Sequence, residues 1–166
     1  MKRSVLVPAV LIMASAAFAA QCSKAESAPQ HQSEVMKHGE MAMGFSQTSS
    51  THHFLLTASG GVVEVQANEA KDTMSREHIR HHLREISKSF GEGDFSSPML
   101  THGKVPPGVP EMQRQKRNIS YTYVETDRGG KVVIRTSDTG ALKAVHEFLR
   151  FQIEDHKTGD PETVRK

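Results

Sequence analysis

The chain has 166 residues, of which 21 are Lys or Arg, 19 are Asp or Glu, ten are His and one is Cys. This near balance of charge argues against a nucleic-acid partner, which needs a basic face, and against binding to an anionic membrane surface. A single cysteine excludes an intramolecular disulfide, so the fold must depend on its hydrophobic core.

Residues 1–19 have the three parts of a secretory signal peptide. The pair Lys2-Arg3 is the positive start, residues 4–18 are uncharged and largely apolar, and Ala17-Phe18-Ala19 is a small-x-small cleavage site. The apolar run is too short to stay in a bilayer as a spanning helix, and no later run is long enough. We therefore expect a periplasmic or secreted protein without a stable membrane span. Cleavage removes two basic residues and leaves 19 of each sign.

Residues 20–50 are rich in Ser, Gln, Ala, Lys and Glu and poor in β-branched and aromatic residues. Such a composition buries too little apolar surface to offset chain entropy, so we predict a flexible tail. Cys22 would allow a lipid anchor, but Gln21 stands where a lipoprotein signal needs a small residue. Thioether and imidazole groups suit Cu(I), so the tail is a candidate for secondary metal capture. The residues concerned are His31, Met36, His38, Met41 and Met43.

A strand–strand–helix pattern follows and occurs twice, over residues 51–90 and 119–159. Each copy joins two strands rich in β-branched residues to a helix with apolar residues at 3.6-residue spacing. The first copy has strands 51–57 and 62–67, a turn at Gly60-Gly61, and a helix from Asp72 or Thr73 to Phe90, stopped by Gly91. The second has strands 119–125 and 131–136, a turn at Gly129-Gly130, and a helix that starts at Asp138 or Thr139 and ends by Gly159.

Two such units bury their apolar faces best by pairing. We predict one α+β domain over residues 51–160, with a four-stranded antiparallel sheet and both helices on one face, as in a circularly permuted ferredoxin-like fold. The Val-rich strands 62–67 and 131–136 pack best at the centre, which places the other two strands at the edges. Residues 161–166 are a short C-terminal tail.

Residues 91–118 join the two units as a long loop that contains four prolines. A loop of this length inside a compact domain is usually functional or disordered. We expect only one short helix in it, at residues 111–118.

Three histidines are predicted to point into the interior from three different elements. His52 shares a strand face with Phe54 and Leu56, while His82 and His146 lie on the apolar stripes of the two helices. Imidazole is the commonest protein ligand for metals such as zinc and copper, so these three form a candidate metal site. The alternative for each is a hydrogen-bonded core residue.

Three further histidines are outer candidates for the same ion. His53 points to the open face of the sheet, and His102 lies in the Pro-rich loop. His78 is four residues before His82, and such a pair can chelate one ion on a helix face, although a polar helix flank is the simpler interpretation.

Catalytic signatures are missing from the sequence. It has no Gly-x-Ser-x-Gly, His-Glu-x-x-His or Cys-x-x-Cys motif and no phosphate loop. No catalytic residue is predicted, and an enzyme is the less favoured class.

A series of short motifs runs through residues 43–160: Met43-Gly44-Phe45, Thr51–Phe54, Gly60–Val65, Gly93-Asp94-Phe95, Pro106–Val109, His146–Ile153 and Thr158-Gly159-Asp160. Their order resembles a family of small exported bacterial proteins, and the resemblance implies no defined activity. It places His52, His53, His102, His146 and His156 within or near the motifs. Similar sequences are sometimes called aspartate carbamoyltransferase, but this chain lacks a Ser-Thr-Arg-Thr-type carbamoyl phosphate loop and is about half as long.

The sequence therefore favours a periplasmic protein that binds or handles a metal, with copper first and zinc second. The alternative is a non-metal binding or adaptor module that meets an unknown periplasmic protein through the open sheet face and residues 96–110. A metal-assisted hydrolase is the third hypothesis, and the sequence leaves the oligomeric state open.

Overall fold

Four antiparallel strands form one sheet in the order β1-β2-β4-β3. A computed structural model describes residues 28–165 and defines β1 as Ser50–Thr57, β2 as Gly60–Ala67, β3 as Ile119–Thr126 and β4 as Gly129–Thr136. The Val-rich strands β2 and β4 are central, and β1 and β3 are the edges, as predicted.

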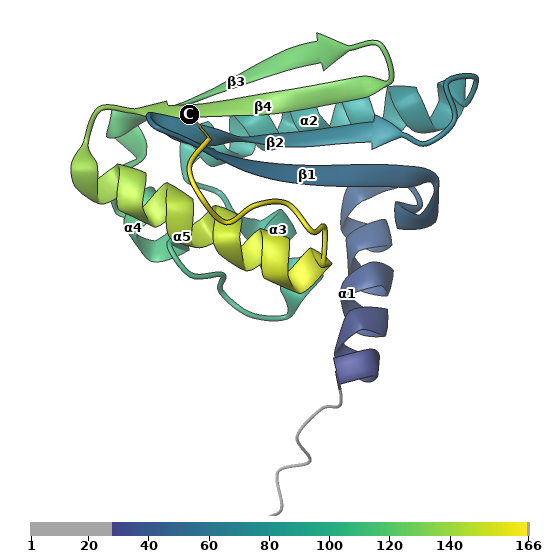
Figure 1. Ribbon diagram of the computed structural model, residues 1–166, viewed down its shortest axis with the longest axis horizontal. Coiled ribbons are helices and arrows are strands. Elements are labelled where there is room, and N and C mark those ends of the chain that lie inside the picture. The colour runs from purple at the N-terminus through teal and green to yellow at the C-terminus, as the bar shows by residue number, and fades with distance from the viewer. Residues whose placement is uncertain (1–27, 166) are drawn as a thin grey trace, which may run out of the picture.

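Two long helices cover the same face of this sheet (Figure 1). They are α2, Thr73–Glu92, and α5, Thr139–His156. The side chains of Asp72 and Asp138 cap them by accepting hydrogen bonds from Ser75 N and Ala141 N. The α+β class and the permuted ferredoxin-like strand order are thus confirmed.

The Gly-Gly pairs do not form the hairpin turns, contrary to the prediction. The turns are at residues 58–59 and 127–128, and both Gly-Gly pairs begin a central strand. A Cβ on Gly61 would lie 2.1 Å from Leu149 Cδ1, and a Cβ on Gly129 would lie 2.2 Å from Val65 O. The glycines are therefore needed for close packing within the sandwich.

Helix α2 also runs two residues past its predicted stop. It continues through Gly91 and ends at Gly93, which has a φ of 81°. A left-handed residue just after a helix is the position that favours glycine, and Gly93 fills it.

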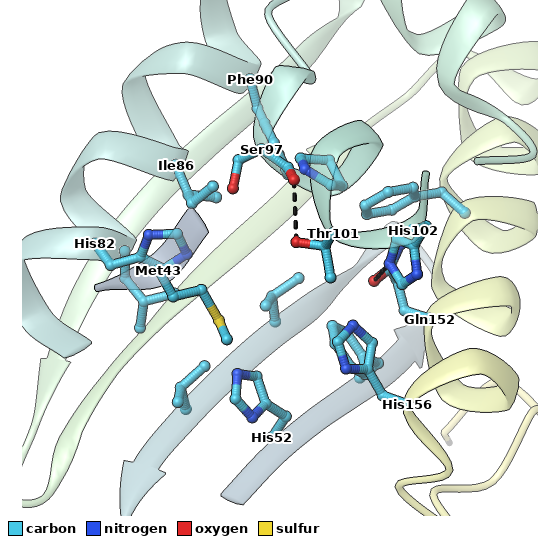
Figure 2. Close-up of a pocket in the computed structure, with 16 residues that line it drawn as sticks. Met43, His52, His82, Ile86, Phe90, Ser97, Thr101, His102, Gln152 and His156 are labelled. Carbon is cyan, nitrogen blue, oxygen red and sulfur yellow. Dashed lines mark hydrogen bonds between the residues drawn. The ribbon is translucent and has the colours of Figure 1, made fainter. Parts of the chain in front are cut away.

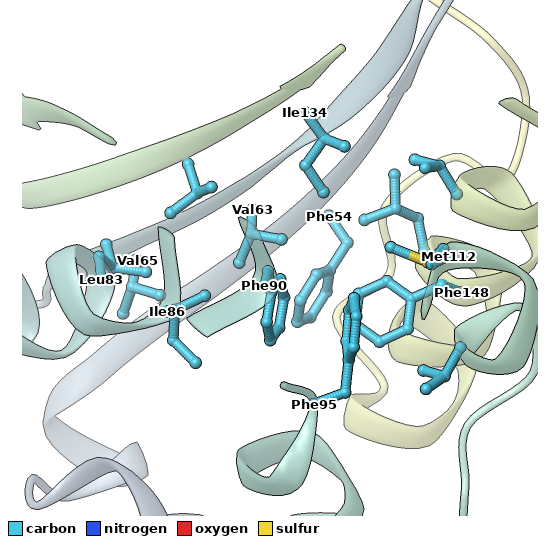
Figure 3. Close-up of a cluster of buried hydrophobic side chains, with 14 of the residues drawn as sticks. Phe54, Val63, Val65, Leu83, Ile86, Phe90, Phe95, Met112, Ile134 and Phe148 are labelled. Atoms are coloured by element: carbon cyan, nitrogen blue, oxygen red, sulfur yellow. The ribbon is translucent and has the colours of Figure 1, made fainter. Parts of the chain in front are cut away.

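An aromatic core joins the helices to the sheet (Figure 3). Phe90 of α2 stacks on Phe95 with ring centroids 4.3 Å apart, and Phe148 of α5 meets Phe90 edge to face at 6.0 Å. Full burial of one such side chain contributes about 1.5–3 kcal/mol. This cluster fixes α5 against β1 and β2 and α2 mainly against β3 and β4.

The connection 91–118 is more ordered than its prolines suggest. It contains α3, Ser96–His102, α4, Val109–Arg114, and the 3-10 turn η2, Lys116–Asn118. Only a short helix at 111–118 was predicted, and α3 was missed. Phe95, Val109 and Met112 are almost completely buried, so the segment belongs to the core.

Much of the predicted flexible tail is also structured. Residues Ala28–Met43 form α1, and Gln47–Ser49 form the 3-10 turn η1. Val35 is 1% exposed, and Gln47 Nε2 donates to the carbonyl oxygens of Val35 and Met36. Extensive contact with α3 docks a helix that composition alone would leave unfolded.

The signal peptide, Cys22 and the rest of residues 20–27 lie outside the described residues. Within residues 28–165, every helix is too short or too polar to cross a membrane.

Candidate functional site

A cavity of about 60 Å³ lies beneath β1, between α2, α3 and α5 (Figure 2). Four histidines line it, each from a different element: His52 from β1, His82 from α2, His102 from α3 and His156 from α5. Met43, at the end of α1, and several core side chains complete the wall. One water molecule needs about 10–15 Å³ of such volume, so the space suits an ion or a very small molecule.

Two of the three predicted inward histidines face this cavity, and the third does not. His52 and His82 line it, as expected from the faces of the strand and helix on which they lie. His146 instead places Nε2 3.0 Å from the carbonyl oxygens of Thr57 and Gly60. It lies at the margin of the apolar stripe, where it meets the end of the β1–β2 hairpin, and it is not part of the cluster.

The outer candidates separate in the same way. His102 lines the cavity, whereas His78 is exposed on α2 and does not share a site with His82. His53 has a side chain that is 41% exposed and places Nδ1 3.0 Å from Asp160 Oδ1.

The residues of the predicted capture arm lie along α1. Met43 reaches the cavity, but Met36, His38 and Met41 do not line it. His31 Nε2 lies 2.8 Å from Asp155 Oδ1 and helps to hold α1 on α5.

Sequence reasoning missed His156, Gln152 and Asp155 as parts of the site. His156 is seven residues after Leu149 and three after Ile153, so the helical spacing that placed the inward residues of α5 also reached it. Gln152 is 3% exposed and lies on the same stripe.

Burial keeps three of the pocket imidazoles neutral. It lowers the pKa of His52 to about 4, with smaller contributions from the neighbouring His82 and His53. The pKa of His82 falls to about 4 through burial and then through His81. Burial, followed by His52 and His102, lowers the pKa of His156 to about 3, although Asp155 acts in the opposite direction. At neutral pH each ring therefore has a free lone pair.

These lone pairs are not used within the fold. His52 Nε2 is buried and has no hydrogen-bond partner within residues 28–165, and the side chains of His82 and His156 form no hydrogen bond there. An unsatisfied buried polar group costs about 1–3 kcal/mol. Such a group calls for an explanation, such as a bound water or ion.

His102 differs because both of its ring nitrogens have partners. Nδ1 lies 2.6 Å from Asp155 Oδ2, and Nε2 lies 3.0 Å from Gln152 Oε1. Burial raises the pKa of Asp155, but hydrogen bonds from His31 and His102 outweigh it, so the net pKa lies below the usual value and the carboxylate is ionised. His102 is thus held in place and is not free to bind an ion.

The ring centroids of His52 and His156 are 5.8 Å apart, with an angle of 10° between the planes. The two rings are stacked, so they border the same part of the cavity. In the part of the chain that the structure describes, no three His, Cys, Asp or Glu side chains form a ready metal cage. The available arrangement is two imidazoles with a thioether nearby.

Comparisons with protein-family models, with curated proteins and with solved structures find no match to this chain. The resemblance to small exported bacterial proteins stays a prediction, and the function is argued from the pocket itself.

Proposed function

We propose that this protein is a periplasmic metal-binding protein that holds Cu(I) between His52 and His156, with the Met43 thioether as a third donor. The observation that carries the proposal is the buried, unpartnered Nε2 of His52, which borders a cavity beside a second neutral imidazole.

A bound ion accounts for the unpartnered nitrogen better than a purely structural role does. A core histidine is usually kept where its buried nitrogens find hydrogen-bond partners, as both nitrogens of His102 and Nε2 of His146 do. His52 has no such partner for Nε2 and still occupies an interior position. Its ring is stacked on that of His156, a second neutral imidazole, with centroids 5.8 Å apart.

The donor set favours Cu(I) over zinc. No carboxylate lines the cavity, so the proposed ligands are all neutral. The cost of taking an ion out of water rises with the square of its charge, which favours a monovalent ion in a site of this kind. Zinc sites usually have four protein or water ligands, whereas Cu(I) accepts fewer donors and binds thioethers.

The size of the cavity argues against a metabolite-binding module. Pockets for such ligands usually measure about 300–1,000 Å³, several times the space found here. Residues 96–102, part of the predicted partner-binding loop 96–110, form α3 and supply Ser97, Pro98 and Thr101 to the cavity wall. This segment therefore encloses the site.

The test is anaerobic competition for Cu(I) between a chromophoric chelator and untagged mature protein. We expect one Cu(I) per chain. Loss of a residue that hydrogen-bonds to a metal ligand typically lowers metal affinity 10–100-fold. His52 and His156 would be ligands themselves, so we expect His52→Gln and His156→Gln to lower the affinity for Cu(I) by on the order of a hundredfold or more. His81→Gln is the matched control, because His81 is exposed on α2.

X-ray absorption of the copper-loaded protein identifies the donors. The wild type should show nitrogen and sulfur neighbours, and Met43→Leu should lose the sulfur. Unchanged Cu(I) affinity in a folded His52→Gln/His156→Gln double variant would refute the proposal. Tight binding of Zn²⁺ with none of Cu(I) would refute the choice of metal.

A further inference from the structure

The cavity has a second polar region around Gln152, away from Met43 and His52 (Figure 2). Gln152 comes from α5 and is 3% exposed, and its Nε2 is buried without a partner within residues 28–165. Thr101 and Ser97 of α3 line the same region, and the Thr101 hydroxyl donates to Ser97 O. One amide atom of Gln152 is thus unused at this end of the cavity.

The hydrogen bond to the neighbouring His102 uses only one of the two amide atoms of Gln152, whichever way the amide is oriented. The ionised Asp155 accepts from His102 Nδ1, so Nε2 of a neutral ring is an acceptor and cannot bond to Gln152 Oε1. Either the ring also carries a proton on Nε2, or the amide is rotated so that Gln152 donates. In the first case the amide NH₂ is left over, and in the second the amide oxygen is left over.

The cavity also has more room than an ion fills. Three donors, His52, His156 and Met43, leave a tetrahedral ion with one open position. Of the roughly 60 Å³, an ion takes only a small part, and one water-sized group needs about 10–15 Å³. Space for two or three non-hydrogen atoms therefore remains inside the same wall.

Resting on the proposed function, we infer that the bound Cu(I) keeps one coordination position open toward Gln152, and that a neutral diatomic molecule of the size of carbon monoxide or dioxygen binds there. Cu(I) is electron-rich and binds such molecules end-on. The free amide atom of Gln152 is a polar group of the cavity wall that we expect to contact this ligand.

The experiment uses carbon monoxide on the anaerobic, Cu(I)-loaded mature protein. Copper retention after desalting is measured first, for every variant, and carbon monoxide is added only afterwards. We expect a single C–O stretching band in the infrared spectrum that moves to lower frequency with ¹³CO. We expect the band to shift in Gln152→Met, which keeps the side-chain length and removes the amide, and to stay in place in His81→Gln.

Loaded protein without a C–O band would overturn the inference, because the coordination shell would then be closed. A band at the same frequency in Gln152→Met would also overturn it, because Gln152 would not lie beside the ligand. If Gln152→Met does not fold, Gln152→Glu makes the same comparison. Failure to retain copper at the first step is a different result, which removes the proposed function and this inference together.

Discussion

The two edges of the sandwich are built from the same strand–strand–helix unit, but their interiors differ. On β1, His52 pairs with Val65 of β2, and on β3, Tyr121 has the same place opposite Ile134 of β4. Ten residues after its capping aspartate, α2 has His82, and α5 has Phe148 at the same distance. The first unit therefore has imidazoles at positions where the second unit has large aromatic rings.

The tyrosine edge shows what the fold needs at these positions. Tyr121 packs edge to face on Phe90 with centroids 5.7 Å apart, and burial raises the pKa of its phenol well above the usual range. Next to it, the Arg84 guanidinium lies 5.0 Å from the centroid of the Tyr123 ring. Aromatic side chains fill the equivalent positions of the second unit, so the backbone arrangement itself does not call for histidine there. This contrast makes a functional origin the better explanation for them.

The largest expected effect of a single substitution is a difference in stability between the variants Phe148→Ala and His82→Ala. Removal of a buried phenylalanine typically costs about 3–5 kcal/mol, because the lost burial and the new cavity add up. His82 borders an existing cavity and its side chain forms no hydrogen bond within residues 28–165, so we expect its loss to cost about 1 kcal/mol or less. Urea unfolding of the metal-free protein measures both. Equal losses would mean that His82 is a core residue and would weaken the contrast.

The next effect is acid destabilisation that originates at the histidine edge. The pKa values of His52, His82 and His156 are lowered to about 4, 4 and 3, below the 6.5 of a free histidine. The unfolded chain then binds more protons than the folded one, so the contribution is complete above pH 6.5 and is lost as the pH falls toward 4. Down to pH 4.5 the loss should be on the order of 8 kcal/mol, because each of the three histidines contributes about two units of pKa shift and one unit corresponds to about 1.4 kcal/mol.

Denaturant unfolding of the metal-free protein between pH 7 and pH 4.5 measures this loss. The lowered pKa values of Asp155 and Asp160 act in another window, because stability from a carboxyl group is lost only as the pH falls below its unfolded value near 3.8. In the double variant His52→Gln/His156→Gln, the free energy of unfolding should fall less steeply as the pH is lowered. The same pH dependence in this variant and in the wild type would show that the acid sensitivity lies elsewhere.

A smaller and opposite effect is expected from removing the unpartnered atoms themselves. His52→Leu and Tyr121→Phe each delete a buried polar atom that has no partner within residues 28–165. We expect each to stabilise the metal-free protein by about 1 kcal/mol, because the desolvation penalty disappears. Only His52→Leu should abolish Cu(I) binding. Loss of Cu(I) binding in both variants would mean that the two edges do not differ in function.

The sequence predicted this fold well because it depends on local periodicity. Two-residue and 3.6-residue spacing located all four strands and both long helices, and Asp72 and Asp138 marked the helix starts. Helix α1 was not predictable in this way, because its contacts are with elements distant in the sequence, chiefly α3. Its order comes from docking, which composition does not reveal.

The pocket was predictable only in part, for a related reason. Phase along a strand or helix shows which side chains point inward, and it placed His52 and His82 correctly. It does not show which inward positions border a void and which meet backbone carbonyls. His146 was therefore assigned to the cluster, although it binds the hairpin, while His156, in the last turn of α5, was left out.

The smallest predicted effect concerns the outer hydrogen bonds of β1. Asp160 Oδ2 accepts from Phe54 N at 3.0 Å, and Arg165 N donates to Leu56 O at 3.0 Å, so the C-terminal segment covers this edge strand. Asp160→Ala should reduce the free energy of unfolding by about 1 kcal/mol, the usual net value of one such hydrogen bond. The amide proton of Phe54 should then exchange faster with solvent, and the uncovered edge should favour association of the chain at high concentration. NMR measures the amide exchange, and size-exclusion chromatography with light scattering measures the association.

Glu162→Ala is the control, because its side chain is exposed and its backbone carbonyl still accepts from Arg150. An unchanged exchange rate at Phe54 would show that the segment does not protect β1, and the two edges would then differ only in their interior.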